Sequence, residues 1–198
     1  MGISETFDRV RSALTPSQRT DFIFILRGGA GEIYTSIYNL FSLEQRVGHS
    51  LHDHKPFLIG DSAGAFVVAG LAAPSLSDPT KPAPTASNLP KMFGDNIYFS
   101  LPHRREQAKE KLEETIGQAR LRDSVLPVCI SACSIFPTPT REYFQYIPDG
   151  HFTPAKSTPS NTHEDVQLSD AALASSAYPL KFGDHTIEET GKRYIDMA

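Results

Sequence analysis

An apolar segment that is interrupted by two glycines constrains the fold of this chain more than any other feature. Residues 55–59 form a short apolar run, the turn Gly60-Asp61-Ser62-Ala63-Gly64 follows, and residues 65–73 are wholly apolar. A helix with no polar face is buried, and a strand that is apolar throughout is typical of a parallel sheet covered by helices. The segment therefore predicts a strand, a tight turn and a helix in the interior of an α/β domain.

The same order of elements occurs once before this segment. The apolar run 21–26 precedes the loop Gly28-Gly29-Ala30-Gly31, and the spacing of apolar residues over 33–47 predicts an amphipathic helix. Later patterns predict a charged helix at 104–122, strands at 125–136 and 142–147, a short helix at 169–177 and a hairpin over 185–195. Because strands and helices alternate through the first half, we expect a three-layer α/β/α sandwich with a mostly parallel central sheet.

Length and charge narrow the class of protein. The chain has 198 residues, which is enough for one domain with a single core. Its formal net charge is −4 and it carries no basic stripe, so we expect no nucleic-acid partner. The longest apolar run, 63–74, is far shorter than the roughly 20 residues that span a bilayer. Without a recognisable signal peptide, the sequence predicts a soluble protein that is cytoplasmic or peripheral at membranes.

The turn around Ser62 carries the clearest chemical signal. Gly60-Asp61-Ser62-Ala63-Gly64 matches the nucleophile elbow, in which a strained turn between a strand and a helix projects a serine hydroxyl above the sheet. Small neighbours are required because the backbone folds back tightly there. The alternative is a tight turn that has only a structural role. The predicted strand and helix on either side favour Ser62 as a nucleophile.

A reactive serine also needs hydrogen-bond donors for the oxyanion of its transition state. The loop Gly28-Gly29-Ala30-Gly31 can turn backbone N–H groups inward at the start of a helix, so it is the candidate oxyanion hole. A generic glycine turn is the alternative. A nucleotide site is not indicated, because the loop has neither the G-x-G-x-x-G spacing nor a Lys-Ser/Thr pair.

Three histidines raise the question of a metal. His49, His52 and His54 share one loop, but no cysteine or patterned carboxylate completes a recognised set of ligands. We therefore expect a solvated loop, no metal and no cofactor.

These elements together resemble the patatin-like phospholipases. That family has a Gly-rich oxyanion loop after the first strand, a G-x-S-x-G elbow after the second, then an A-S-x-A-x-P-x-x-F segment and a later catalytic aspartate. The matching parts of this chain, in the same order from about residue 21 to the end, are Gly28 to Gly31, Gly60 to Gly64, Ala174 to Phe182, and Tyr194-Ile195-Asp196.

The resemblance implies a specific chemistry. Asp196 would be the second catalytic residue, forming a Ser-Asp dyad with Ser62 and receiving its proton by direct hydrogen bond. It further implies a lipid ester substrate at a membrane or micelle surface, with no metal in the reaction. The resemblance does not decide whether the protein needs a protein activator.

The chain departs from the family pattern in two places. The loop has Ala30 and Glu32 where the family usually has a third glycine and a basic residue, and Met197 and Ala198 follow Asp196 where the family has two glycines. A terminal carboxylate so close to Asp196 would oppose its charge and leave the segment prone to fraying. We therefore expect one domain over 1–198 whose natural chain continues past Ala198.

The segment 74–103 is rich in proline, serine and threonine and is long for a loop in a compact domain. Several large apolar residues within it would be unusual in a plain loop, which predicts either a mobile cover over an acyl channel or a simple packing role. These residues are Met92, Phe93, Ile97, Tyr98 and Phe99.

Two other functions are consistent with the same residues. A conventional Ser-His-Asp esterase could use Ser62, Asp170 and His185 in that chain order. A patatin-fold interaction module that has lost its acid geometry is the second alternative, suggested by the Asp196-Met197-Ala198 ending. The dipeptide Asp149-Gly150 precedes the Ala174 segment, so it is better explained as a turn.

Overall fold

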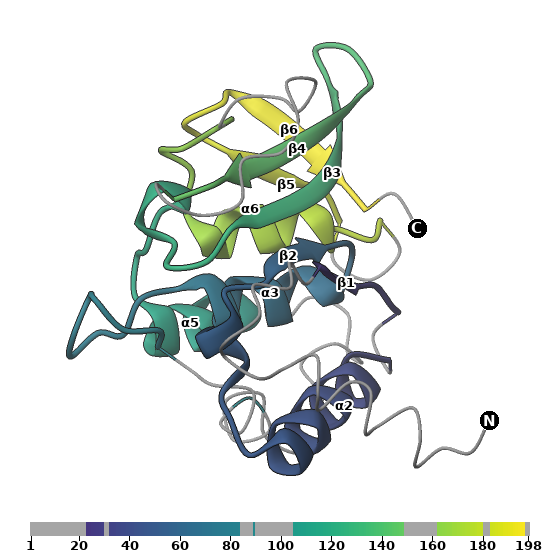
Figure 1. Cartoon of the computed structure of the whole chain (residues 1–198). Helices are drawn as coiled ribbons and strands as arrows, with labels where there is room; N and C mark the ends of the chain where they lie inside the picture. The colour runs from purple at the N-terminus through teal and green to yellow at the C-terminus, as the bar shows by residue number, and fades with distance from the viewer. Residues whose placement is uncertain are drawn as a thin grey trace, which may run out of the picture.

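The structure, a computed structural model of the chain, describes residues 23–29, 32–83, 89, 105–148, 162–179 and 183–196. Strands and helices alternate through the first half and strands predominate in the second (Figure 1). The elements are β1 (Ile23–Leu26), α2 (Glu32–Val47), the 3₁₀ helix η1 (Leu51–His54), β2 (Phe57–Gly60), α3 (Gly64–Ala72), α5 (Arg105–Ile116), the 3₁₀ helix η2 (Leu121–Asp123), β3 (Val128–Phe136), β4 (Thr140–Tyr146), α6 (Leu168–Ser175), β5 (His185–Ile187) and β6 (Lys192–Ile195).

These strands form one mixed sheet. β1, β2 and β3 are parallel neighbours, as expected for strands joined through helices. β4 and β6 both pair with β3 in the antiparallel direction, and β5 pairs with β6 as a hairpin. The expected α/β class is confirmed, and the parallel part of the sheet consists of β1, β2 and β3.

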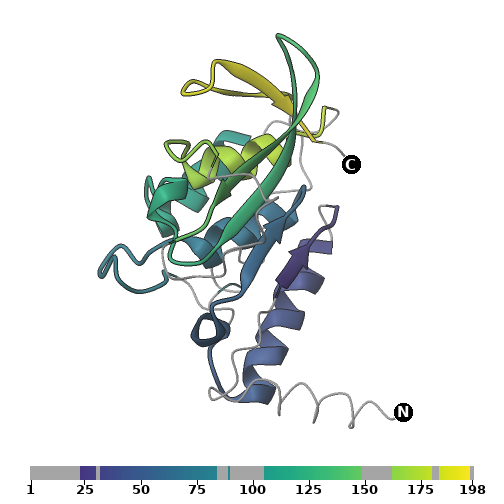
Figure 2. The same cartoon turned by 45° about the horizontal axis from the view of Figure 1, so that its top comes forward.

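One face of the sheet is buried beneath helices. α3 and α6 contact each other and β3, and α3 also contacts β1 and β2 (Figures 1 and 2). Leu58 and Ile130 on this face are almost fully buried, whereas Ile23 and Ile25, which alternate to the other face of β1, are 56% and 62% exposed. The core therefore lies between the sheet and the α3–α6 pair.

α3 is the central helix of this core. Each of its residues is buried, which agrees with the absence of a polar face in its sequence. In the part of the chain that the structure describes, no helix is both long enough and apolar enough to cross a bilayer.

Most boundaries agree with the sequence patterns within a few residues. The charged helix is shorter than expected, because α5 ends at Ile116 and Gly117 takes the left-handed conformation, with φ of 62°. Glycine in that conformation commonly terminates helices. Of the segment 74–103, the structure describes residues 74–83 and Leu89, so the large apolar residues at 92–99 lie outside the described residues.

Candidate active site

Ser62 lies in the turn between β2 and α3, with a backbone φ of +54°. Few non-glycine residues adopt this left-handed conformation, and surrounding contacts must hold it in place. The adjacent peptides are tied to the end of β1 and to the loop that follows it: Asp61 N–H donates to the Leu26 carbonyl at 3.1 Å, and Ala63 N–H donates to the Gly28 carbonyl at 3.3 Å. The turn thus has the geometry expected of an elbow.

The two glycines of the turn are required by close packing. A Cβ on Gly64 would lie 2.0 Å from the carbonyl oxygen of Leu26, and one on Gly60 would lie 2.8 Å from the Cα of Ala65. Both neighbours are backbone atoms, which cannot move aside as a flexible side chain can. Close approach of β1, β2 and α3 therefore depends on glycine at both positions.

The sheet register brings Asp196 to the same place. β2 pairs with β3 as far as Ile130, and β6 pairs with β3 from the opposite direction, ending with Ile195 beside Cys133. β4 occupies the other edge of β3 over 128–134, so β2 and β6 share one edge and their carboxyl ends approach each other. The residues that follow these two strands meet in the gap between them.

The hydroxyl of Ser62 donates a hydrogen bond to Oδ2 of Asp196 at 2.6 Å. Ser62 is 7% exposed and Asp196 is 8% exposed, so most of the contact is removed from solvent. A short bond from a hydroxyl to a carboxylate is stronger than one between neutral groups. The expected direct contact between Ser62 and Asp196 is therefore present.

Gly28, at the start of the glycine loop, lies directly beside the elbow. Gly28 has a φ of 149°, which L side chains rarely adopt, and its carbonyl receives Ala63 N–H. Ala63 N–H, the donor next to the serine, is thus directed at the loop. Gly29 is also described, whereas Ala30 and Gly31 lie outside the described residues.

Asp61 connects the elbow to two other strands. Arg27, which follows β1, approaches its Oδ2 at 3.2 Å, and the hydroxyl of Ser131 on β3 donates to its Oδ1 at 2.8 Å. Arg27 is 74% exposed, so this ion pair adds little stability. Its effect is to fix the direction of the Asp61 side chain.

Asp170 and His185 lie together in a different cluster. His185 Nε2 is 2.9 Å from Oδ1 of Asp170, and Lys109 on α5 donates to the same oxygen at 2.8 Å. Burial favours a higher pKa for Asp170, but the bonds to His185 and Lys109 outweigh it and hold the pKa below its ordinary value. The carboxylate that accepts from Ser62 is that of Asp196, so this arrangement does not have the bonding of a triad.

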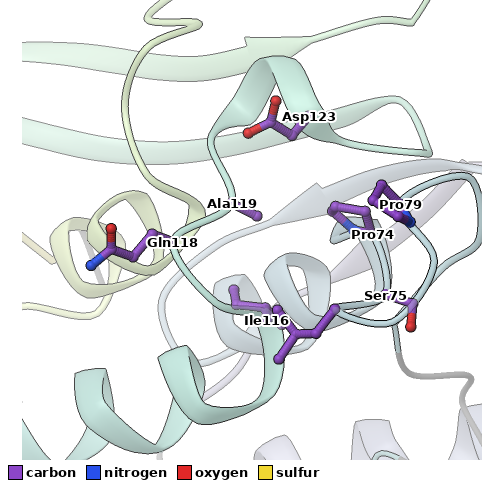
Figure 3. Close-up of a pocket in the computed structure, with 8 residues that line it drawn as sticks. Pro74, Ser75, Pro79, Ile116, Gln118, Ala119 and Asp123 are labelled. Atoms are coloured by element: carbon purple, nitrogen blue, oxygen red, sulfur yellow. The ribbon is translucent and has the colours of Figure 1, made fainter.

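A hollow of about 460 Å³ lies at the other end of α3 (Figure 3). Ser62 precedes α3, whereas the hollow is formed by the chain that follows this helix together with residues around the end of α5. It is lined by Pro74, Ser75, Leu76, Pro79, Ile116, Gln118, Ala119 and Asp123. The dyad is not part of this hollow.

Two further groups of sequence candidates have these outcomes. Within the described ranges, no cluster of three or more His, Cys, Asp or Glu side chains is placed to hold a metal ion. Asp149 and Gly150 lie outside the described residues.

Ser175 is a further residue of the site that the sequence patterns did not single out. Its hydroxyl oxygen accepts a hydrogen bond from Ser62 N–H at 2.9 Å. The only available signal was its position in the Ala174 to Phe182 segment.

A scan against models of protein families gives no match to this chain, and a search of curated proteins finds no significantly similar sequence. Its function is therefore inferred from the geometry of the site and from the motifs.

Proposed function

We propose that this protein is a serine acyl hydrolase that cleaves fatty-acyl esters of phospholipids or related lipids through a Ser62–Asp196 dyad. The observation that carries the proposal is the 2.6 Å hydrogen bond from Ser62 Oγ to Asp196 Oδ2, made by a serine held in a left-handed turn. A serine in a strained turn that points at a buried carboxylate combines an elbow with an adjacent base, which is one of the ways in which a nucleophile is activated.

In the first half-reaction, Asp196 accepts the proton of Ser62 as Oγ attacks the ester carbonyl. Backbone N–H groups of the loop 28–31 stabilise the resulting oxyanion, a contribution of about 2.7–4 kcal/mol per donor in other enzymes. The tetrahedral intermediate collapses, the C–O bond to the alcohol breaks, and Asp196 returns the proton to the leaving oxygen.

In the second half-reaction, water hydrolyses the acyl-enzyme. Asp196 now takes a proton from the water molecule as the water oxygen attacks the acyl carbon. Asp196 then returns this proton to Ser62 Oγ when the fatty acid leaves. No redox step or external co-reactant other than water is needed. Lipid as the substrate rests on the resemblance to patatin-like phospholipases rather than on this geometry.

The same proposal includes the finer architecture, a three-layer α/β/α sandwich of the patatin-like type. The exposed apolar side chains Ile23 and Ile25 support it, since a second helical layer would cover that face of β1. An experimental structure of the intact chain in which this face stays open to solvent would contradict the third layer.

A fluorophosphonate probe tests the nucleophile. Labelling is expected in the intact chain and is expected to be lost in Ser62→Ala, with esterase activity lost in parallel. No labelling of a folded intact chain would favour an interaction module without catalysis. Labelling that persists in Ser62→Ala would assign the nucleophile elsewhere.

Two variants separate the dyad from a conventional triad. Asp196→Asn keeps the shape of the side chain but removes most of its basicity, so turnover should fall by about 10²–10⁴. His185→Ala is the matched control, because its ring bonds to Asp170; its turnover, measured per folded molecule, should remain close to that of the parent. Loss of turnover in His185→Ala alone would favour the triad.

A further inference from the structure

Ser175, the last residue of α6, contacts the backbone of Ser62 directly. Its Oγ accepts the hydrogen bond from Ser62 N–H at 2.9 Å, although 113 positions separate the two residues in the chain. Ser175 is 1% exposed, so water does not compete for this bond. A buried backbone N–H without a partner is rare and destabilising, so Ser175 satisfies a donor that the left-handed turn orients away from ordinary helix or sheet partners.

The next residues of the same segment hold the other member of the dyad. The carbonyl of Ala177 accepts Asp196 N–H at 3.0 Å. One short stretch at the end of α6, residues 175–177, therefore bonds to the backbone of both Ser62 and Asp196. Ser62 follows β2 and Asp196 follows β6, and these strands are not paired with each other. The stretch bridges the gap in the sheet across which the dyad forms.

α6 is itself held firmly at its other end. Asp170, in its first turn, contacts Lys109 on α5 and His185 on β5. The helix also packs against α3, so its end has little freedom to shift relative to the elbow (Figure 1). A hydroxyl at position 175 is thus presented to Ser62 by a rigid element, as positioning of catalytic groups requires.

We propose that Ser175 is a positioning residue of the site: its hydroxyl fixes the peptide that carries Ser62 and so aims Ser62 Oγ at Asp196 and at the scissile carbonyl. The proposal rests on the hydrolase function above. Ser175 does not touch the reacting atoms, and it takes no proton from the substrate. Its contribution is orientation, and small errors in orientation lower the rate of a reaction that depends on a near-attack geometry.

The principal test compares Ser175→Ala with Ser176→Ala. Ser176 is the matched control, because it is buried at the same helix end, but its hydroxyl donates to carbonyls of its own helix, those of Ala172 and Leu173, among the described residues. For a soluble ester, kcat of Ser175→Ala should fall about 10- to 100-fold, the scale of one lost buried hydrogen bond, with KM within twofold. Ser176→Ala should retain kcat within about twofold. Equal losses in both variants would overturn the proposal.

A second variant shows whether the loss of kcat in Ser175→Ala comes from misfolding or from the missing hydrogen bond. Ser175→Cys keeps the size of the side chain and a weak acceptor, so its kcat should lie between those of the parent and Ser175→Ala. The pH dependence of kcat should keep its shape in both variants, since Asp196 remains the base. A kcat of Ser175→Cys at or below that of Ser175→Ala, or a displaced pH profile, would contradict a positioning role.

Hydrogen exchange at the Ser62 amide tests the bond without any use of activity. Protection of this amide should fall at least tenfold more in Ser175→Ala than in Ser176→Ala, with neighbouring amides of α3 unchanged. Unchanged protection would overturn the contact itself. If the amide responds as expected while Ser62→Ala retains full activity, the contact stands and the proposed hydrolase function fails, so the two failures are distinguishable.

Discussion

The two halves of the dyad are held by different means. The turn that carries Ser62 is set by backbone packing, because Gly60 and Gly64 lie against atoms of Ala65 and Leu26 that leave no room for a side chain. The strand that leads to Asp196 is held by side chains. Lys192 and Tyr194 on β6 donate to Glu142 on β4, at 2.5 and 3.1 Å.

This difference follows from the sheet. β2 lies between two parallel strands and is covered by α3, so its end is surrounded by main chain. Glu142 and Tyr194 lie on the two strands that flank β3, β4 and β6. Their side chains meet across β3, where Glu142 is paired with the small residue Ala132. Backbone packing tolerates almost no change in volume, whereas a polar network can lose one member at a time. We expect the serine side to be the more sensitive to mutation.

The largest effect is expected for Gly64→Ala. The added methyl would overlap the Leu26 carbonyl, so β1 and α3 must separate, and we expect a loss of about 3 kcal/mol or more of unfolding free energy. Gly48→Ala is the control: nothing lies within 4 Å of its added methyl, and only its φ of 72° is unfavourable. It should lose about 1 kcal/mol. Equal losses in urea unfolding would refute the packing argument.

Asp170→Asn should have the next largest effect. Asp170 lies on α6, the helix whose end bonds to the segments that carry Ser62 and Asp196. The substitution removes the charge that pairs with Lys109 and His185, and we expect a loss of about 2–3 kcal/mol, less than for a fully buried pair because Lys109 is 34% exposed. The loss should be measured by urea unfolding at pH 7.

The same variant has a defined pH dependence. The pKa of Asp170 is held below its ordinary value in the folded state, so its stabilisation is complete above the unfolded value of about 3.9 and is lost as pH falls through the folded value. Below about pH 4 the difference in unfolding free energy between parent and Asp170→Asn should therefore shrink. A difference that grows on acidification would contradict the sign.

On the aspartate side, Glu142→Gln should lose about 1–2 kcal/mol. Burial favours a higher pKa for Glu142, but the bonds from Lys192 and Tyr194 prevail and hold its pKa below the ordinary value. Tyr194→Phe is the milder companion. It loses one hydroxyl but keeps the ring against Phe144, 5.3 Å away between centroids, so its loss should be about 1 kcal/mol or less. A larger loss in Tyr194→Phe than in Glu142→Gln would argue against the ionic network.

The smallest effect is expected outside both regions. Lys111 and Glu114 on α5 form an ion pair at 2.5 Å, but their side chains are 45% and 55% exposed. Lys111→Ala should change the unfolding free energy by less than about 0.5 kcal/mol, as judged by the urea midpoint. A change as large as that of Glu142→Gln would mean that exposure does not separate the two kinds of ion pair.

Local patterns in the sequence were sufficient for the elements on the serine side. The apolar runs that became β1 and β2, and the helix after Gly64 with no polar face, each have a period and a length that identify the element. The elbow around Ser62 could be located because a strand, small residues and a buried helix occur within twenty consecutive positions.

The aspartate side could be located only through a family resemblance. Nothing in the sequence around Asp196 distinguishes it from other carboxylates, and a triad of Ser62 with Asp170 and His185 stayed open as an alternative. The antiparallel pairing of β6 with β3, which brings Asp196 to the elbow, joins residues some sixty positions apart. No local periodicity reports such a pairing.

The sequence by itself determined the strands and the α-helices, where the glycines of the elbow must be, and which serine stands in a strained turn. Those properties depend on side chains a few positions apart, so they can be read directly from residue order. Tertiary structure alone decided that Asp196 accepts the hydrogen bond from the Ser62 hydroxyl and that Asp170 bonds to His185. It also decided that the Ser175 hydroxyl accepts the hydrogen bond from the Ser62 amide. These contacts depend on strand order and register, which arise from packing of the whole chain rather than from any one segment.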